Sequence, residues 1–190
     1  MNKVFKVVAL GATAVGKSSI LLRAARNQYT DGHQPTIGAV YYRKTVQLPK
    51  TEEVIKLELW DTAGQERYNS VTQLYYRNAC VILIVFSMDD ADSLQKAIDW
   101  NNVLVDQNSD ATRCLVGNKS DICKKCPRAE QYAQDNNLKY FVVSAKMGNG
   151  VEELFQHIAQ SCNKLKQHTQ SAKVLIVEPK EYIKDKKFCC

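Results

Sequence analysis

Several short groups of residues in this sequence combine charged, hydroxyl and small side chains in a way that suits the binding of phosphate and a divalent metal. GATAVGKS (11–18) matches the pattern GxxxxGK[ST] and lies between an apolar stretch and a segment with helical spacing. Its glycines let several N–H groups face one anion at a helix N-terminus, where the helix dipole adds positive charge. Lys17 would reach the outer phosphates and Ser18 would offer a hydroxyl to Mg²⁺; a chance glycine turn is disfavoured by the flanking pattern. The candidate phosphate-binding residues are Thr13, Ala14, Val15, Gly16, Lys17, Ser18 and Ser19.

Two further groups, NKSD and SAK, each end a predicted strand and point to a particular base. In an open α/β sheet the ligand lies at the carboxyl ends of the strands. The Asp121 carboxylate can accept from both the ring N–H and the exocyclic amine of guanine, whereas adenine offers no such pair of donors. Such a site can reject the wrong base by roughly 10⁴-fold. The Ala145 N–H could meet the guanine oxygen, and the candidate base-binding residues are Asn118, Lys119, Asp121, Ser144, Ala145 and Lys146.

The motif WDTAGQE (60–66) and Thr36 indicate hydrolysis rather than phosphoryl transfer to a second substrate. Asp61 and Thr36 are the oxygen donors expected to hold Mg²⁺ together with the serine of the phosphate loop. Gly64 allows close backbone approach to a terminal phosphate, and Gln65 can orient a water for in-line attack. The segment around Thr36 is expected to be ordered by the γ-phosphate.

Alternating strands and helices are required to hold these groups at one edge of a sheet. Apolar runs predict six strands, and helical spacing predicts four helices between and after them. This pattern favours an α/β fold with a mostly parallel sheet and helices on both faces. The predicted strands are 4–11, 44–49, 54–61, 80–86, 112–118 and 139–145, and the predicted helices are 17–29, 92–108, 127–137 and 151–166. The linker KTEE (50–53) is too short for a crossover, so its two strands should form an antiparallel hairpin.

Size, charge and cysteine usage bound the class of protein. The 190 residues suit one domain with a tail, and no apolar run is long enough for a signal-peptide core or a membrane span, so we expect a protein that stays in the cytosol. Seven cysteines in that compartment should be mostly thiols. The CKKC group (123–126) lacks the further ligands of a zinc site, which favours two ordinary thiols.

The net charge is +6, and much of the excess of positive residues lies at the end of the chain, where residues 164–190 carry seven lysines. These residues are predicted to form a flexible tail. No aromatic residues alternate with these lysines, so nucleic-acid binding is not expected.

The motifs together resemble those of the Ras superfamily of small GTPases, and WDTAGQERYNSV followed by YYRNA resembles the Rab branch. The resemblance implies a P-loop NTPase G domain over residues 1–163. It places Tyr29 against the edge of the guanine. The sequence departs from Ras-like loops at Thr13 and Ala14, which stand where glycines are usual. After Thr36, the stretch GAVYY stands in place of GVDF, which is commoner in Rabs. The resemblance implies an effector surface made by Ile37, Gly38, Tyr41, Trp60 and Tyr75.

By the same resemblance the protein would be a GTP/GDP switch of vesicle trafficking, nearest to the endosomal Rabs, with slow hydrolysis of GTP and Mg²⁺ as cofactor. The implied partners are a guanine-nucleotide exchange factor, a GTPase-activating protein, a GDP-dissociation inhibitor, a Rab escort protein, a geranylgeranyl transferase and effectors, and the chain is expected to be a monomer. Cys189 and Cys190 would carry paired geranylgeranyl groups. These lipids would anchor the protein to the cytoplasmic face of an endosomal membrane, with a carrier-bound pool in the cytosol. Two alternatives remain from the motifs alone: a P-loop ATPase or nucleotide kinase, and a scaffold that does not cycle.

Overall fold

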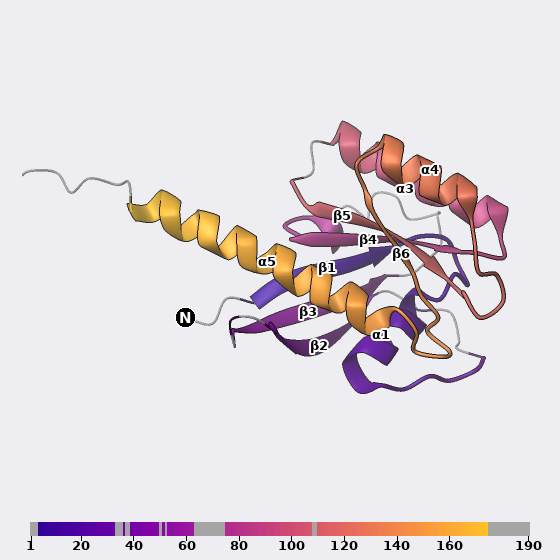
Figure 1. Cartoon of the computed structure of the whole chain (residues 1–190), viewed down its shortest axis with the longest axis horizontal. Helices are drawn as coiled ribbons and strands as arrows, with labels where there is room; N and C mark the ends of the chain where they lie inside the picture. The colour runs from indigo at the N-terminus through magenta and orange to yellow at the C-terminus, as the bar shows by residue number, and fades with distance from the viewer. Residues whose placement is uncertain are drawn as a thin grey trace, which may run out of the picture.

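A computed structural model of the chain describes residues 4–32, 36, 39–49, 51, 53–62, 75–107 and 110–174, apart from the side chains of 39 and 166–174. The described residues form one six-stranded sheet in the order β2-β3-β1-β4-β5-β6 (Figure 1). All neighbouring strands run parallel except β2 and β3, which are antiparallel. The predicted fold class, a mostly parallel sheet with one antiparallel strand, is confirmed. The strands are β1 (Val4–Leu10), β2 (Ala39–Gln47), β3 (Val54–Thr62), β4 (Val81–Ser87), β5 (Thr112–Asn118) and β6 (Lys139–Val142).

Helices cover both faces of this sheet, as predicted. Helices α1 and α5 lie against one face, and α3 and α4 lie together against the other (Figure 1). The central strand β4 is fully buried along its length, which explains its continuous apolar sequence VILIVFS. The helices are α1 (Lys17–Arg26), α3 (Ala91–Asp106), α4 (Pro127–Asp135) and α5 (Val151–Val174).

The antiparallel pair is longer than the sequence pattern suggested. Strand β2 begins at Ala39 rather than at residue 44, because residues 39–43 pair in register with 58–62 of β3. Side chains of β3 alternate between buried and exposed positions, which is the pattern of a sheet covered on one face only. The run Tyr41–Arg43 consists of two tyrosines and an arginine, so hydrophobicity alone did not identify it as part of the strand.

Two of the predicted helix and strand ends also move inward. Helix α1 stops at Arg26 rather than at residue 29, because Asn27 adopts a left-handed conformation and its N–H donates to the carbonyl of Arg23. Strand β6 ends at Val142 rather than 145, so the SAK residues lie in the loop that follows it.

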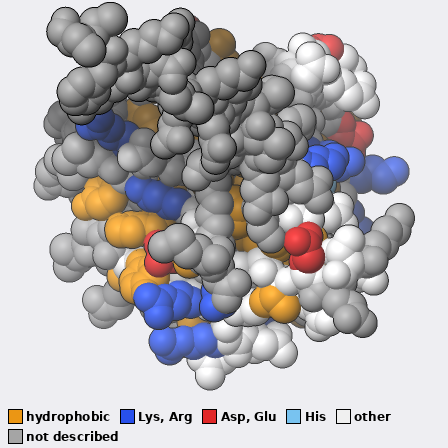
Figure 2. Space-filling view, turned by 90° about the vertical axis from the view of Figure 1, so that its left-hand side faces the viewer, with side chains coloured by type: hydrophobic (Ala, Val, Ile, Leu, Met, Phe, Trp, Pro, Cys, Tyr) orange, Lys and Arg blue, Asp and Glu red, His pale blue; other side chains and the backbone are white. Residues whose placement is uncertain are grey.

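Helix α5 continues to Val174, eight residues beyond the predicted helix end at residue 166, so the first part of the predicted tail (164–190) is helical. No proline or glycine occurs between Val151 and Val174, so nothing in the sequence stops the helix before that point. Its last turns extend beyond the sheet (Figure 1). Residues 175–190 lie outside the described part. Viewed from the end where α5 extends, Lys and Arg side chains gather beside hydrophobic ones (Figure 2).

Among the described residues, no helix combines the length and the apolar character needed to cross a membrane.

Candidate functional site

A pocket of about 540 Å³ opens at the carboxyl ends of the parallel strands, where the sequence motifs were expected to meet. Its volume is in the range of small-molecule sites. The loop after β1, the end of β5 and the loop after β6 contribute to its wall, as do residues of the segment between α1 and β2. The lining residues are Thr13, Ala14, Gly16, Lys17, Ser18, Ser19, Tyr29, Thr30, Asp31, Gly32, Thr36, Thr62, Asn118, Lys119, Asp121, Ile122, Ala145 and Lys146.

The loop between β1 and α1 forms one end of the pocket. Gly16 has a φ of 91°, and a Cβ there would lie 2.2 Å from the amide nitrogen of Asn118, so only glycine fits. Lys17 begins α1, is only 6% exposed, and donates to the carbonyls of Gly11 (3.0 Å) and Ala12 (2.9 Å). The loop therefore places a cation among backbone groups at the positive end of a helix.

Burial lowers the pKa of Lys17 to about 8, while the negative charge of Asp61 acts in the opposite direction. The side chain is thus an ammonium group that has lost most of its hydration. An anion that entered the pocket would favour the charged form, because an opposite charge nearby raises the pKa of a lysine.

The three predicted metal ligands converge beside this lysine. The hydroxyls of Ser18 and Thr36 lie 3.0 Å apart, and the Thr36 hydroxyl donates to Asp61 Oδ2 at 3.1 Å. Asp61 is 1% exposed. These residues come from α1, from the segment before β2 and from β3, so only the fold brings them together. Two hydroxyls and one carboxylate make an all-oxygen donor set of the kind that Mg²⁺ prefers, so the residues present fit that ion.

At the other end of the pocket, Asn118 joins the phosphate loop to the SAK loop. Its Nδ2 donates to the carbonyl of Val15 at 2.8 Å, and its Oδ1 accepts from the Ala145 N–H at 3.1 Å. The predicted bracing role of Asn118 thus has a specific geometry. The Ala145 N–H, which was expected to meet a guanine oxygen, is directed at Asn118 in this structure.

Asp121, the predicted base-reading carboxylate, lies on the pocket wall with one oxygen held in place. Its Oδ1 accepts from the Ser144 hydroxyl at 2.5 Å, and the same hydroxyl accepts from the Met147 N–H at 3.0 Å. Ser144 is fully buried, so it supports the site from behind. Lys119 has a left-handed backbone with a φ of 65°, and its ammonium group lies 3.7 Å from Asp89.

Of the remaining predicted site residues outside the effector surface, one is buried, one lines the pocket and four lie outside the described residues. Val15, within the phosphate loop, is buried and does not line the pocket. Tyr29 lines the pocket and donates to Asp31 at 3.0 Å. Gly64 and Gln65, and the lipidation candidates Cys189 and Cys190, fall outside the described residues.

The predicted effector surface is described in part. Tyr41 and Trp60 are directly opposite each other on β2 and β3, with ring centroids 5.9 Å apart. Tyr41 is 43% exposed, whereas Trp60 and Tyr75 are half-buried. Lys6 lies over the Trp60 ring and Arg43 over the Tyr41 ring, at 4.9 and 5.6 Å from the centroids. Ile37 and Gly38 lie outside the described residues.

Sequence reasoning missed five residues that line the pocket: Thr30, Asp31, Gly32, Thr62 and Ile122. Thr62 directly follows Asp61 in the WDTAGQE motif, and Ile122 directly follows NKSD, so adjacency to a motif was the available signal.

The CKKC thiols of Cys123 and Cys126 are free and partly buried against the core beneath α4. Over the described ranges, no group of three or more Cys, His, Asp and Glu is placed to hold a metal.

Comparison with known proteins places these features in one family. The family model of the Ras family matches residues 6–164. The chain is 42% identical over 170 residues to the Ras-related protein Rab-5A of Dictyostelium discoideum, covering 86% of this chain and 84% of that protein. It is 37% identical over 194 residues to the GTP-binding protein YPT52 of Saccharomyces cerevisiae, covering 85% and 83%. It is also 42% identical over 161 residues to the GTP-binding protein ypt5 of Schizosaccharomyces pombe, covering 82% and 76%.

Proposed function

The chain belongs to the Ras family and, within it, to the endosomal group of Rab small GTPases, and we propose that the pocket described above is where it binds GTP and hydrolyses it to GDP. The protein is a GTP hydrolase of vesicle trafficking, including endocytic traffic. One observation carries the assignment of the site. A buried lysine and the hydroxyls of Ser18 and Thr36, the latter bonded to the buried Asp61, lie at one end of the pocket, and a carboxylate suited to guanine lies at the other.

The base end recognises guanine through Asp121. The Ser144 hydroxyl holds one carboxylate oxygen in place, so the group is already oriented for the two donors of the guanine edge. The aliphatic part of Lys119 lies along the base, and Tyr29 packs at its edge. The Ala145 N–H exchanges its bond with Asn118 for one with the guanine oxygen, or shares it between the two acceptors.

The phosphate end holds the β- and γ-phosphates with the N–H groups of the loop and with the Lys17 ammonium group. Lys17 keeps its two bonds to loop carbonyls and directs its third N–H at the phosphates. Ser18, Thr36 and Asp61 would hold Mg²⁺, which would neutralise phosphate charge and polarise a γ-phosphoryl oxygen. The mutual hydrogen bonds of these three side chains give way to bonds with the ligand.

Hydrolysis requires a water positioned in line with the bond between the β- and γ-phosphates. We assign that role to Gln65, with Gly64 allowing the backbone to approach the terminal phosphate. In the described residues no arginine lines the pocket. The intrinsic rate should therefore be slow, on the order of 10⁻⁴ per second as in Ras itself, with a GTPase-activating protein supplying the missing charge.

The test of this assignment is single-turnover hydrolysis of GTP by the purified chain in Mg²⁺. The unmodified protein should release phosphate slowly. Gln65→Leu should bind GTP equally well and hydrolyse it at least about tenfold more slowly, because one hydrogen bond to the water is lost. Equal single-turnover rates for the two proteins would rule out the role of Gln65.

The switch acts at a membrane through its partners. An exchange factor and a GDP-dissociation inhibitor act on the nucleotide state and on the lipidated form, and effectors bind the surface formed by Tyr41, Trp60, Tyr75, Ile37 and Gly38. A Rab escort protein and a geranylgeranyl transferase attach two lipids, at Cys189 and Cys190. Two lipid chains hold a protein on a membrane far more firmly than one. The site of action is the cytoplasmic face of an endosomal membrane, with a carrier-bound cytosolic pool.

The membrane assignment has its own test. Replacing both terminal cysteines with serine should leave GTP affinity unchanged and move the tagged protein from membranes to the cytosol. Single replacements serve as matched controls and should give partial release, since one lipid binds reversibly. A doubly substituted protein that stays on membranes would contradict the proposed anchor.

A further inference from the structure

Arg23 of α1 does not line the pocket but bonds to two residues that do, Ala145 and Lys146. Its guanidinium group donates through Nε to the carbonyl of Ala145 at 2.9 Å and through Nη2 to the carbonyl of Lys146 at 2.8 Å. We propose that Arg23 is a positioning residue that holds the SAK loop against α1 and thereby slows the release of guanine nucleotide. The proposal rests on the function assigned above, since it concerns the same pocket.

All three nitrogens of the Arg23 guanidinium group donate hydrogen bonds. The Nε and Nη2 edge engages two successive carbonyls of the SAK loop, while Nη1 donates to the carbonyl and the side-chain oxygen of Asn27 at 3.0 and 3.2 Å. Asn27 is the residue that ends α1. One planar, charged group therefore joins the end of the helix to the loop, and lysine cannot make the same set of bonds from a single nitrogen.

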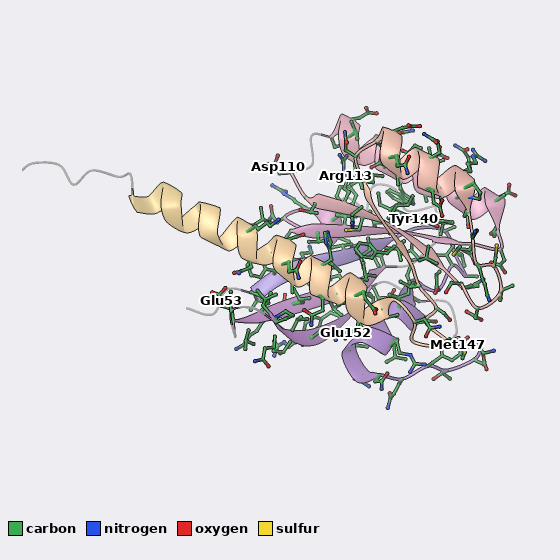
Figure 3. The ribbon with its side chains drawn as sticks, in the orientation of Figure 1. Glu53, Asp110, Arg113, Tyr140, Met147 and Glu152 are labelled. Atoms are coloured by element: carbon green, nitrogen blue, oxygen red, sulfur yellow. The ribbon has the colours of Figure 1, made fainter. Side chains whose placement is uncertain are left out.

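The loop that Arg23 holds is short and is partly held by hydrogen bonds within itself. Within it, the Ser144 N–H donates to Asn149 and the Gly148 N–H donates to Ser144. Gly148 also lies beside the Arg23 side chain, because a Cβ at that position would be 3.9 Å from Arg23 Cδ. Met147, in the same loop, lies at the α1 side of the molecule (Figure 3). Arg23 thus contacts this loop over several residues.

Asn118 and Arg23 hold the same loop from two sides. Asn118 accepts from the Ala145 N–H inside the pocket and links it to Val15 of the phosphate loop. Arg23 binds the Ala145 carbonyl from outside, and it is not among the residues that line the pocket. Fixing both the N–H and the carbonyl of Ala145 defines the orientation of the peptide groups on either side of its Cα. The amide proposed to meet the guanine oxygen is therefore held in place before the base binds.

Arg23 also connects the two ends of the pocket. It lies six residues after Lys17 on a single helix, about 9 Å along the axis. The helix carries the phosphate-binding N-terminus, and Arg23 ties its last turn to the base-binding loop. Loss of this tie should loosen the contacts to the base without altering Lys17, Ser18 or Asp61.

The test compares the dissociation rates of two ligands from Mg²⁺-containing full-length protein. One ligand is GDP, and the other is the diphosphate of 2-aminopurine riboside, which lacks the guanine oxygen and also the ring N–H, so that each variant is compared with wild type for the same ligand. Arg23→Gln should release GDP about tenfold faster, the effect of losing one well-placed contact of about 1.4 kcal/mol. It should change the release of the analogue by less than about twofold, because that ligand makes no bond that depends on the Ala145 N–H. Arg23→Lys should give an intermediate increase for GDP.

Arg26→Gln is the matched control, since Arg26 is exposed one turn away on the same helix and lies over the Tyr42 ring at 5.8 Å. It should leave both rates unchanged. Unchanged GDP release from Arg23→Gln, or equal acceleration for both ligands, would overturn the proposal. If Arg23→Gln does not fold, the GDP and analogue rates of Arg23→Lys decide in the same way. Failure of the unmodified protein to bind GDP would instead contradict the proposed function.

Discussion

The two ends of the pocket are built differently. At the base end, Ser144 holds Asp121 and the carbonyl of Val15 holds Asn118, so these two side chains are positioned without a ligand. At the phosphate end, Ser18, Thr36 and Asp61 bond to one another. In the proposed complex, bonds to Mg²⁺ would replace them. The comparison suggests that the base end is preorganised for specificity, and that the phosphate end changes between ligand states.

This difference between the two ends of the pocket is what a GTP/GDP switch requires. The guanine is present in both the GTP and GDP forms, so its contacts should be constant. The γ-phosphate distinguishes the two forms, so the side chains near it should be the ones that rearrange. Thr36 comes from the segment between α1 and β2, and its hydroxyl contacts both Ser18 and Asp61.

The largest expected effect is at the base end. Asp121→Asn should weaken GDP binding by about 10⁴-fold, because an amide cannot accept from both guanine donors. The same variant should gain affinity for xanthosine diphosphate, since xanthine carries a carbonyl where guanine carries the amine, and the new amide can donate to it. Competition between the two diphosphates, measured on wild type and variant, checks this reversal. A uniform loss of both ligands would indicate that Asp121 only supports the fold.

The next effect concerns the metal. Chelation of Mg²⁺ should speed the release of both GDP and GTP by about a hundredfold, since the metal contributes several kcal/mol of charge stabilisation at the phosphates. Stopped-flow release of a fluorescent nucleotide, with and without chelator, gives the ratio. Release rates that do not respond to chelation would show that Ser18, Thr36 and Asp61 hold no metal in the complex.

A smaller effect separates the two nucleotide states. Thr36→Ala should weaken GTP binding by about tenfold, the cost of one charged hydrogen bond or metal contact, and should leave GDP binding nearly unchanged. Equilibrium titrations with GDP and with a non-hydrolysable GTP analogue measure both values. Equal losses for the two ligands would contradict the idea that this end of the pocket reads the γ-phosphate.

The smallest effect is at the support of the base end. Ser144→Ala removes the hydroxyl that holds Asp121 and should weaken GDP binding by about fivefold, in keeping with a net hydrogen-bond contribution of about 1 kcal/mol. Ser161→Ala, which changes a hydroxyl on α5 that does not line the pocket, is the matched control. A loss in Ser144→Ala as large as that in Asp121→Asn would mean that the carboxylate depends on Ser144 entirely.

Much of this site could be predicted from the sequence because its chemistry is concentrated in short motifs next to strand ends. The strand pattern predicted the sheet and its antiparallel hairpin, and the motifs identified Lys17, Asp61 and Asp121. What could not be predicted depends on distant contacts. Arg23 meets residues more than a hundred positions later in the chain, and no local pattern distinguishes it from Arg26.

Element ends were less predictable for local reasons. The start of β2 contains mixed polar and aromatic residues, whose strand conformation depends on pairing with β3. The end of α5 has no breaking residue, so the loss of apolar spacing after residue 166 was mistaken for the end of the helix. The roles of Gln65, Cys189 and Cys190 stay predictions.

The central claim is that Asp121 and the loops around it select guanine in a Mg²⁺-dependent nucleotide pocket. Competition binding of GTP and ATP to the full-length protein in Mg²⁺ tests it most directly. The account predicts that GTP binds at least about 10⁴-fold more tightly than ATP, because adenine leaves the Asp121 carboxylate without its two donors. Comparable affinities for the two nucleotides would contradict it.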